Sequence, residues 1–333
     1  MTAFFGKLGV LCSVFVVGLA AGTQAQASDA VCHYNEIGAL PLELLAEGPV
    51  VQGSINGKPV RMLLETGATV TFLLKAEMDR QGLSMAHQRQ RVSGASDGAN
   101  MFLVRIRDIT IGPTQVSNAN FSVLDAHENA DYSALIGVDF LLQADMELSL
   151  ADRQVKFFHA DGCKDKDLAY WDSNALDIPM EAFWMRDQRQ VFEVELNGQK
   201  LRATIDTGAA VSTVSLAAAE RAGVTPESAG VVPACASCGA GANMKHAYFA
   251  PFNSFSIGGE TIKNPHIHMA SRFGRNGPDM VLGRDFLKTH HVLMAVSQGR
   301  LYFSYLGGQV FLNPTESAAT APANESQAEQ GQP

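Results

Sequence analysis

Alternating apolar and polar residues mark two strands that follow similar tight turns. Asn56-Gly57 precedes an alternating run at residues 60–64, and Asn197-Gly198 precedes a second one at residues 201–205. Because Asn-Gly tolerates the positive φ angles of a two-residue turn, each pair predicts a β-hairpin. The period of two predicts strands that bury one face and carry other groups on the opposite face.

The two halves of the chain repeat each other, which predicts two homologous β-lobes. Residues 54–61 match residues 195–202 at an offset of 141. At this offset an acidic turn at the end of the first strand matches an acidic turn at the end of the second. The matched turns are Glu65, Thr66, Gly67 and Ala68 with Asp206, Thr207, Gly208 and Ala209. Residues 98–101 match 241–244, and residues 137–141 match 283–287.

Short helices are expected within this β framework. One pair is predicted at residues 74–81 and 216–222, and a second pair begins near Asp139 and Asp285. Each of these aspartates follows a glycine by two residues and precedes Phe-Leu, which favours a helix N-cap over a catalytic role.

The first 27 residues have the pattern of an export signal. Lys7 precedes an apolar run at residues 8–21, and Ala25-Gln26-Ala27 is typical of a cleavage site. The apolar run is shorter than the roughly 20 residues that a spanning helix needs. We therefore expect residues 1–27 to be removed and the protein to be periplasmic or secreted, with no stable membrane span.

Composition favours a folded, two-domain, acidic protein. The chain has 333 residues, of which 46% are hydrophobic and 18% charged. Its net charge of -9 becomes -10 when Lys7 leaves with the signal. An acidic chain without a basic cluster excludes nucleic acid as an expected partner.

Four cysteines remain after the signal, an even number for an oxidising compartment. A bridge between Cys32 and Cys163 would join the two ends of the first lobe. Cys235 and Cys238 would then close a small loop. A redox pair or half a metal site is the alternative for that second pair, but no βαβ setting or further regularly spaced ligands accompany it.

These patterns divide the chain into five segments. After the signal we expect lobes at residues 28–159 and 190–312, joined by a connector at 160–189 that packs across the lobe junction. Residues 313–333 are rich in polar and small residues and are expected to form a disordered tail.

The paired acidic turns and a later apolar-apolar-Gly element in each half resemble the aspartic protease superfamily, particularly its retropepsin-like members. The later elements are Leu135-Ile136-Gly137 and Val281-Leu282-Gly283. The resemblance covers residues 48–158 and 190–306, and two copies in one chain look like the two-lobed pepsin arrangement. It implies an all-β acid-protease fold of two tandem retropepsin-like barrels with short helices, related by pseudo-twofold symmetry.

By this resemblance, Glu65 and Asp206 are the catalytic pair of an aspartic endopeptidase. Two nearby carboxylates cannot both ionise, so the pair would hold one proton and activate water against a peptide bond, best at acidic to mildly acidic pH. Thr66 and Thr207 look like hydroxyls that cross-brace the turns. Gly67 and Gly208 would permit close approach.

A flap over the substrate is implied at residues 92–101 and 233–244, where Gly94, Gly98 and Gly241 lie. A plain glycine-rich hairpin is the alternative for these segments.

Glu65 departs from the family pattern, which has Asp in both turns. One additional methylene moves the carboxyl by roughly 1 Å, enough to slow a tuned site on the order of a hundredfold. Three outcomes stay open: the backbone adjusts, the site binds peptides without cutting them, or two chains pair their second lobes. The corresponding functions are an endopeptidase acting on polypeptide, as a monomer or a homodimer, and a weak or inactive protease-like peptide-binding or assembly protein.

The nine histidines are interpreted as structural or surface residues. None lies in a helical His-Glu-x-x-His arrangement, and we find no Gly-rich phosphate loop. No metal or cofactor is expected.

Overall fold

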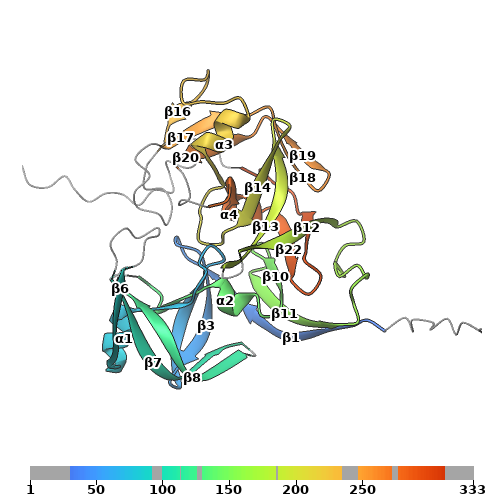
Figure 1. The fold of residues 1–333 in the computed structure, drawn as a ribbon. Helices are drawn as coiled ribbons and strands as arrows, with labels where there is room; N and C mark the ends of the chain where they lie inside the picture. Colours follow the sequence, from blue (N-terminus) through green and yellow to red (C-terminus); the bar gives the residue numbers. More distant parts are fainter. Residues whose placement is uncertain are drawn as a thin grey trace, which may run out of the picture. The chain divides into compact units, whose positions relative to one another are not determined.

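Strands form most of the computed structural model, which describes residues 31–91, 100–112, 114–125, 130–184, 187–234, 247–271 and 277–311. Two lobes of β-strands with short helices account for these residues (Figure 1). The all-β, two-lobed fold expected from the repeat is thus confirmed.

The first lobe is an eight-stranded sheet whose ends curl together. Its order is β2-β3-β4-β9-β5-β8-β7-β6. An additional pairing of β3 with β7 closes six of these strands into a barrel, in the order β3, β4, β9, β5, β8 and β7. The strands are β2 (Glu43–Leu44), β3 (Pro49–Ile55), β4 (Lys58–Leu64), β5 (Phe72–Leu74), β6 (Met85–Arg91), β7 (Asn100–Ile111), β8 (Thr114–Leu124) and β9 (Ala134–Ile136). The helices are α1 (Lys75–Gln81) and α2 (Val138–Leu141).

The second lobe repeats the arrangement of the first. Its strands follow the order β13-β14-β21-β15-β20-β17-β16, and β18 pairs with β13 and β19. They are β13 (Asp187–Leu196), β14 (Gln199–Ile205), β15 (Thr213–Ser215), β16 (Val232–Pro233), β17 (Ala247–Pro251), β18 (Ser254–Ile257), β19 (Glu260–Lys263), β20 (His266–Ala270) and β21 (Met280–Leu282). The helices are α3 (Leu216–Arg221) and α4 (Arg284–Leu287).

The two predicted hairpin turns have the same geometry. Asn56 and Gly57 have φ angles of 51° and 77°, and Asn197 and Gly198 have the same two values. Both φ angles are positive, as a two-residue turn between twisted strands requires. The sequence repeat is therefore a structural repeat at the hairpin that leads to each acidic turn.

A six-stranded antiparallel sheet joins the lobes, with three strands from each. Its order is β1-β11-β10-β22-β23-β12, and β10 pairs with β22 through Met146 and Met294 (Figure 1). The strands are β1 (His33–Pro41), β10 (Asp145–Ser149), β11 (Gln154–Asp161), β12 (Leu176–Trp184), β22 (His290–Ala295) and β23 (Arg300–Tyr305). The connector expected at residues 160–189 thus contains β12.

Part of that connector packs on the joining sheet. Cys163 forms a disulfide with Cys32, as the sequence indicated for the ends of the first lobe. Trp171 stacks on His291 of β22 with ring centroids 4.3 Å apart. The connector therefore covers the strands that link the two halves.

The alternation along β4 and β14 places their core faces as predicted. Val60, Met62 and Leu64 belong to the main hydrophobic core. The opposite face is covered too, because Leu63 on β4 and Thr204 on β14 are both buried. Both faces of these strands are therefore covered by other parts of the protein.

Several predictions concern residues outside the described ranges. They are the export signal at residues 1–27, the tail at 313–333, the flap glycines Gly94, Gly98 and Gly241, and the Cys235–Cys238 pair. Within the described residues no helix is long and apolar enough to cross a membrane.

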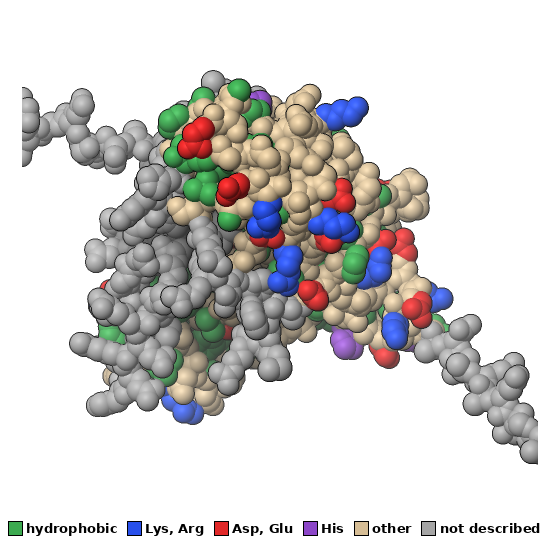
Figure 2. Space-filling model, turned by 45° about the horizontal axis from the view of Figure 1, so that its top comes forward, with side chains coloured by type: hydrophobic (Ala, Val, Ile, Leu, Met, Phe, Trp, Pro, Cys, Tyr) green, Lys and Arg blue, Asp and Glu red, His purple; other side chains and the backbone are tan. Residues whose placement is uncertain are grey.

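The surface shown in Figure 2 mixes charges of both signs. Lys and Arg side chains there lie beside Asp and Glu side chains. Ion pairs such as Lys200–Glu193 and Arg221–Asp279 occur on the second lobe. This mixture does not resemble the continuous basic surface that binds phosphate backbones.

Candidate active site

The two acidic turns begin where β4 and β14 end. Glu65 directly follows β4 and its N–H donates to Ile136 O at 3.0 Å, and the N–H of Asp206 donates to Leu282 O, also at 3.0 Å. Ala68 N–H then bonds Glu65 O at 3.1 Å, and Ala209 N–H bonds Asp206 O at 3.3 Å. Equivalent backbone bonds give the two carboxylates equivalent positions in their lobes.

Two buried threonines fasten the turns to each other. Thr66 N–H donates to Thr207 Oγ1 at 3.1 Å, and Thr207 N–H donates to Thr66 Oγ1 at 3.0 Å. The hydroxyl of Thr66 donates to Ile205 O at 2.9 Å, and that of Thr207 donates to Leu64 O at 2.5 Å. These four reciprocal bonds hold two segments 141 residues apart in sequence in one symmetric arrangement.

The glycines of the turns lie against the carboxylates of the opposite lobe. A Cβ on Gly67 would lie 2.5 Å from Cγ of Asp206, and one on Gly208 would lie 2.5 Å from Cδ of Glu65. These distances are too short for any real Cβ. Glycine is thus required by close approach, and the same observation shows that each acid reaches across to the other turn.

Glu65 and Asp206 differ in their surroundings. Glu65 is 8% exposed, and burial raises its pKa well above the ordinary value. The charge of Asp206 and a side-chain hydrogen bond between the two acids raise this pKa further, against smaller opposing effects of the Gly67 N–H and Arg284. Burial and the neighbouring acid therefore both favour the protonated form of Glu65.

The Asp206 carboxylate accepts two backbone hydrogen bonds within its own turn. The N–H groups of Gly208 and Ala209 donate to its Oδ1 at 2.9 and 3.2 Å. These bonds fix the carboxylate against the turn that carries Glu65.

Arg284 lies beneath the Asp206 turn and bridges the lobes. Its Nη1 donates to Glu47 O, Gly208 O and Thr207 O at 2.6, 2.9 and 3.2 Å, and its Nη2 donates to Ala46 O at 2.5 Å. The side chain is 7% exposed, and burial lowers its pKa. One guanidinium therefore ties the Asp206 turn to the segment between β2 and β3 of the other lobe.

Our sequence analysis missed Arg284, although a signal was present. The matching position of the first lobe is Val138. The N–H of Val138 donates to Ala68 O, and the N–H of Arg284 donates to Ala209 O, the equivalent carbonyl of the second acidic turn. A charged residue where the repeat has valine is the feature that could have pointed to this contact.

The N-cap assignment of Asp139 and Asp285 is wrong. Gly137 and Gly283 occupy the N-cap positions, without a side-chain cap. Asp139 instead accepts bonds from Thr71 N–H at 3.0 Å and Thr71 Oγ1 at 2.8 Å. Asp139 and Asp285 thus bond the loop that follows each acidic turn, and Asp285 Oδ1 also accepts the Phe286 N–H of its own helix at 2.9 Å.

Asp285 makes the equivalent contacts in the second lobe. It accepts bonds from Ser212 N–H at 2.7 Å and Ser212 Oγ at 2.6 Å. Burial raises the pKa of Asp285 to about 6. Ser212 Oγ in turn accepts the Gly283 N–H at 2.9 Å, so this aspartate fixes the loop that follows the acidic turn.

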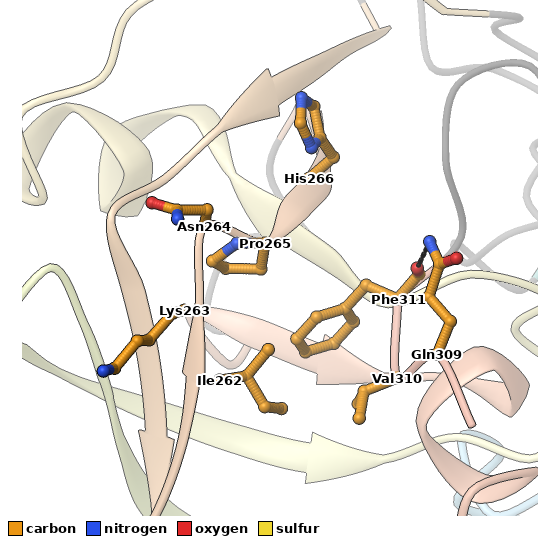
Figure 3. Close-up of a pocket in the computed structure, with 8 residues that line it drawn as sticks. All are labelled: Ile262, Lys263, Asn264, Pro265, His266, Gln309, Val310 and Phe311. Carbon is orange, nitrogen blue, oxygen red and sulfur yellow. Dashed lines mark hydrogen bonds between the residues drawn. The ribbon is translucent and has the colours of Figure 1, made fainter. Parts of the chain in front are cut away.

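Other possible sites share no residue with the acidic turns. In the described part of the chain, no three His, Cys, Asp or Glu side chains are grouped to hold a metal ion. A pocket of about 320 Å³ lies in the second lobe, where the Phe311 ring lies beside Ile262 and Val310 (Figure 3). Its other lining residues are Lys263, Asn264, Pro265, His266 and Gln309, so the lining contains no carboxylate.

Comparisons with protein families give one match in each half of the chain. Residues 51–143 match the family described as gag-polyprotein putative aspartyl protease, and residues 192–286 match the family described as aspartyl protease. Each match contains one acidic turn; the first ends two residues after α2, and the second ends within α4. No curated protein matches the chain.

Proposed function

Because the chain belongs to the aspartyl proteases, with one such domain in each half, we propose that it is an endopeptidase that cuts extended polypeptide between its lobes. The observation that carries this proposal is the convergence of Glu65 and Asp206, each of which lies against the glycine of the opposite acidic turn. The reciprocal threonine bonds support it, because a catalytic pair must be held within a fraction of an ångström.

In the proposed reaction the two acids have different first roles. Ionised Asp206 accepts a proton from water, whose oxygen attacks the peptide carbonyl carbon, while Glu65 gives its proton to the carbonyl oxygen. The tetrahedral intermediate carries two hydroxyl groups. Its C–N bond then breaks as the nitrogen takes the proton held by Asp206. One of the two hydroxyl groups gives its proton to Glu65. The products are a carboxylic acid and an amine, and both acids regain their starting states.

The pH dependence follows from the raised pKa of Glu65. An ordinary glutamic acid has lost its proton above about pH 5. Because the pKa of Glu65 is raised, we expect cleavage to persist above pH 5. Cleavage should then fall as the pH rises through the pKa of Glu65, because Glu65 loses the proton that it must donate.

Digestion of a denatured polypeptide, followed by mass spectrometry across roughly pH 3 to 8, tests this function. Wild type and Glu65→Asp should both cut, and we expect Glu65→Asp to be faster because both turns then carry the same acid at the same depth. Glu65→Gln should be inactive, since it cannot supply the proton. Absence of cleavage by both wild type and Glu65→Asp would overturn the proposal and favour a peptide-binding protein.

The close approach at Gly208 gives a second prediction. Gly208→Ala should lose most activity and about 1 to 3 kcal/mol of folding free energy, because its Cβ overlaps the Glu65 carboxyl. Gly198→Ala is the matched control: its φ of 77° also opposes alanine, yet nothing lies within 4 Å of the added carbon. Urea unfolding and initial cleavage rates should show both variants destabilised but only Gly208→Ala inactive. Equal activity of the two would contradict the assignment of the Gly208 contact.

We also propose that the protein acts in the periplasm or outside the cell, on a polypeptide substrate. The pattern of residues 1–27 supports export. The Cys32–Cys163 disulfide is consistent with it, because such bonds persist in oxidising compartments.

A further inference from the structure

The imidazole of His290 is buried between helix α4 and the β18–β19 hairpin. Its ring stacks on Phe286 of α4, with ring centroids 3.9 Å apart, and Phe303 of β23 packs edge-on against it. The side chain is 0% exposed. Nε2 lies 3.0 Å from Oε2 and 3.3 Å from Oε1 of Glu260, the first residue of β19. A fully buried histidine is thus paired with a carboxylate from another element.

The other ring nitrogen of His290 faces a second acceptor. Nδ1 lies 2.9 Å from the backbone oxygen of Phe286 and 3.1 Å from Oγ1 of Thr289. The Thr289 hydroxyl donates to the same carbonyl oxygen at 2.9 Å. A carbonyl oxygen can only accept, and two lone pairs at this distance would repel each other. Nδ1 therefore carries a proton.

The contact with Glu260 requires a second proton. An ionised carboxylate is an acceptor, and a neutral imidazole has one N–H, which Nδ1 already uses. Nε2 and Glu260 therefore bond only when the pair holds one proton more than a neutral ring beside an ionised carboxylate. The observed contacts are those of the protonated pair.

Among the described residues, the other titratable side chains around His290 have partners elsewhere. Tyr305 of β23 is tilted against the ring, with centroids 5.6 Å apart, and its hydroxyl donates to a backbone carbonyl. On α4, Arg284 bonds the second acidic turn and Asp285 bonds the loop after that turn. Glu260 is thus the charged group that faces the ring.

The hairpin that carries Glu260 has few backbone bonds to the rest of its lobe. In the described sheet β19 pairs with β18, and β18 pairs with β13 through two residue pairs. On the other side of the contact, His290 donates to α4, which begins with Arg284. The pair thus fastens a peripheral hairpin to the helix that holds the second acidic turn. The matching position of the first lobe is Ala144, which cannot make such a link.

We propose that His290 and Glu260 form a proton-dependent link that holds the β18–β19 hairpin on α4 in acid and weakens as the pH rises. Histidine changes its charge between about pH 5 and 8. When the pair loses its extra proton, the lone pair of Nε2 faces an ionised carboxylate inside the protein, which is unfavourable. The second lobe would thus respond to the pH of its surroundings, whether or not it cuts peptides.

The direction of the effect follows from where the extra proton is bound. In the folded protein it is held between His290 and Glu260, whereas in the unfolded chain the two side chains are separate. A proton bound more tightly by the folded state stabilises that state at acidic pH, and the stabilisation is lost as the pH rises.

Urea unfolding of wild type and Glu260→Gln from pH 5 to 8 tests the link. Glutamine serves either form of the ring, because its N–H can donate to a neutral Nε2 and its oxygen can accept from a protonated one. The unfolding constant of wild type, divided by that of Glu260→Gln, should therefore rise at least about tenfold between pH 5 and pH 8. Groups that titrate elsewhere cancel in this ratio.

Two further variants accompany this measurement. His290→Gln removes the titrating ring, so the ratio of wild type to this variant should rise in the same way. Glu193→Gln is the matched control, because Glu193 forms an exposed ion pair with Lys200 on the same lobe. Exposed pairs contribute little, and this ratio should stay constant from pH 5 to 8.

Two local measurements on the same proteins locate the effect. Nitrogen NMR of the His290 ring in wild type should show two protonated nitrogens at pH 5 and one at pH 8. At pH 8 the backbone amides of β19 should exchange with solvent faster in wild type than in Glu260→Gln, whereas those of β10 should exchange equally.

A wild-type to Glu260→Gln ratio that stays constant from pH 5 to 8 would contradict the link. So would a His290 ring with one protonated nitrogen throughout that range. None of these readings involves cleavage. A wild type that shows them without cutting any peptide would therefore overturn the proposed function and leave the link in place.

Discussion

Asp206→Asn should reduce kcat/KM for a peptide substrate by at least about a thousandfold, the scale of a lost general base. Asparagine has the same shape as aspartate but cannot take a proton from water. Its oxygen can still accept the N–H groups of Gly208 and Ala209, so the turn should survive. Initial rates on one peptide, measured at the pH optimum of the wild type, give the comparison.

Asp177→Asn serves as its control. Asp177 lies on β12 in the joining sheet, where it pairs with Arg300 at the surface. The same chemical change there should leave cleavage within about twofold of wild type, since exposed ion pairs contribute little. Full activity of Asp206→Asn would remove Asp206 from the reaction, whatever its position.

Arg284→Met should have the largest effect on folding, a loss on the order of 3 to 5 kcal/mol. Methionine fills much of the arginine volume but leaves the carbonyls of Ala46, Glu47, Thr207 and Gly208 without their donor. Urea unfolding at neutral pH measures the change. Because two of these carbonyls belong to the Asp206 turn, cleavage should fall as well.

Arg221→Met provides the surface counterpart in the same lobe. Arg221 pairs with Asp279, and nearly half of its side chain is exposed. Its loss should cost less than about 1 kcal/mol. If Arg284→Met were no more destabilising than Arg221→Met, the guanidinium would not hold the two lobes together as described.

The repeat made the lobes and the acidic turns predictable from sequence. Each hairpin and each carboxylate occurs twice, so two weak local signals support each other, and the identical φ angles at Asn56 and Asn197 reflect this. The turn from strand to acid depends only on nearby residues. The strands and turns that position Glu65 and Asp206 were therefore predictable from local sequence patterns.

Features that depend on distant partners were not predictable in the same way. β12 pairs with β23 across more than a hundred residues, so no local period distinguished this strand from a connector. The Asp139 and Asp285 side chains find donors in Thr71 and Ser212, about 70 residues earlier in the chain. Standard capping preference assumes that no such competitor is present.

The asymmetry of the site was only partly visible in the sequence. Glu65 stood out because the second turn has Asp, but its burial and its bond with Asp206 appear only when both turns are in place.

The proton held between Glu65 and Asp206 can be followed through the NMR signal of the Glu65 carboxyl carbon, titrated in wild type and in Asp206→Asn. In wild type we expect the midpoint well above the ordinary glutamic acid value of about 4.3, and in Asp206→Asn a lower midpoint because one negative charge has been removed. An ordinary midpoint in wild type that does not move in Asp206→Asn would contradict a shared proton.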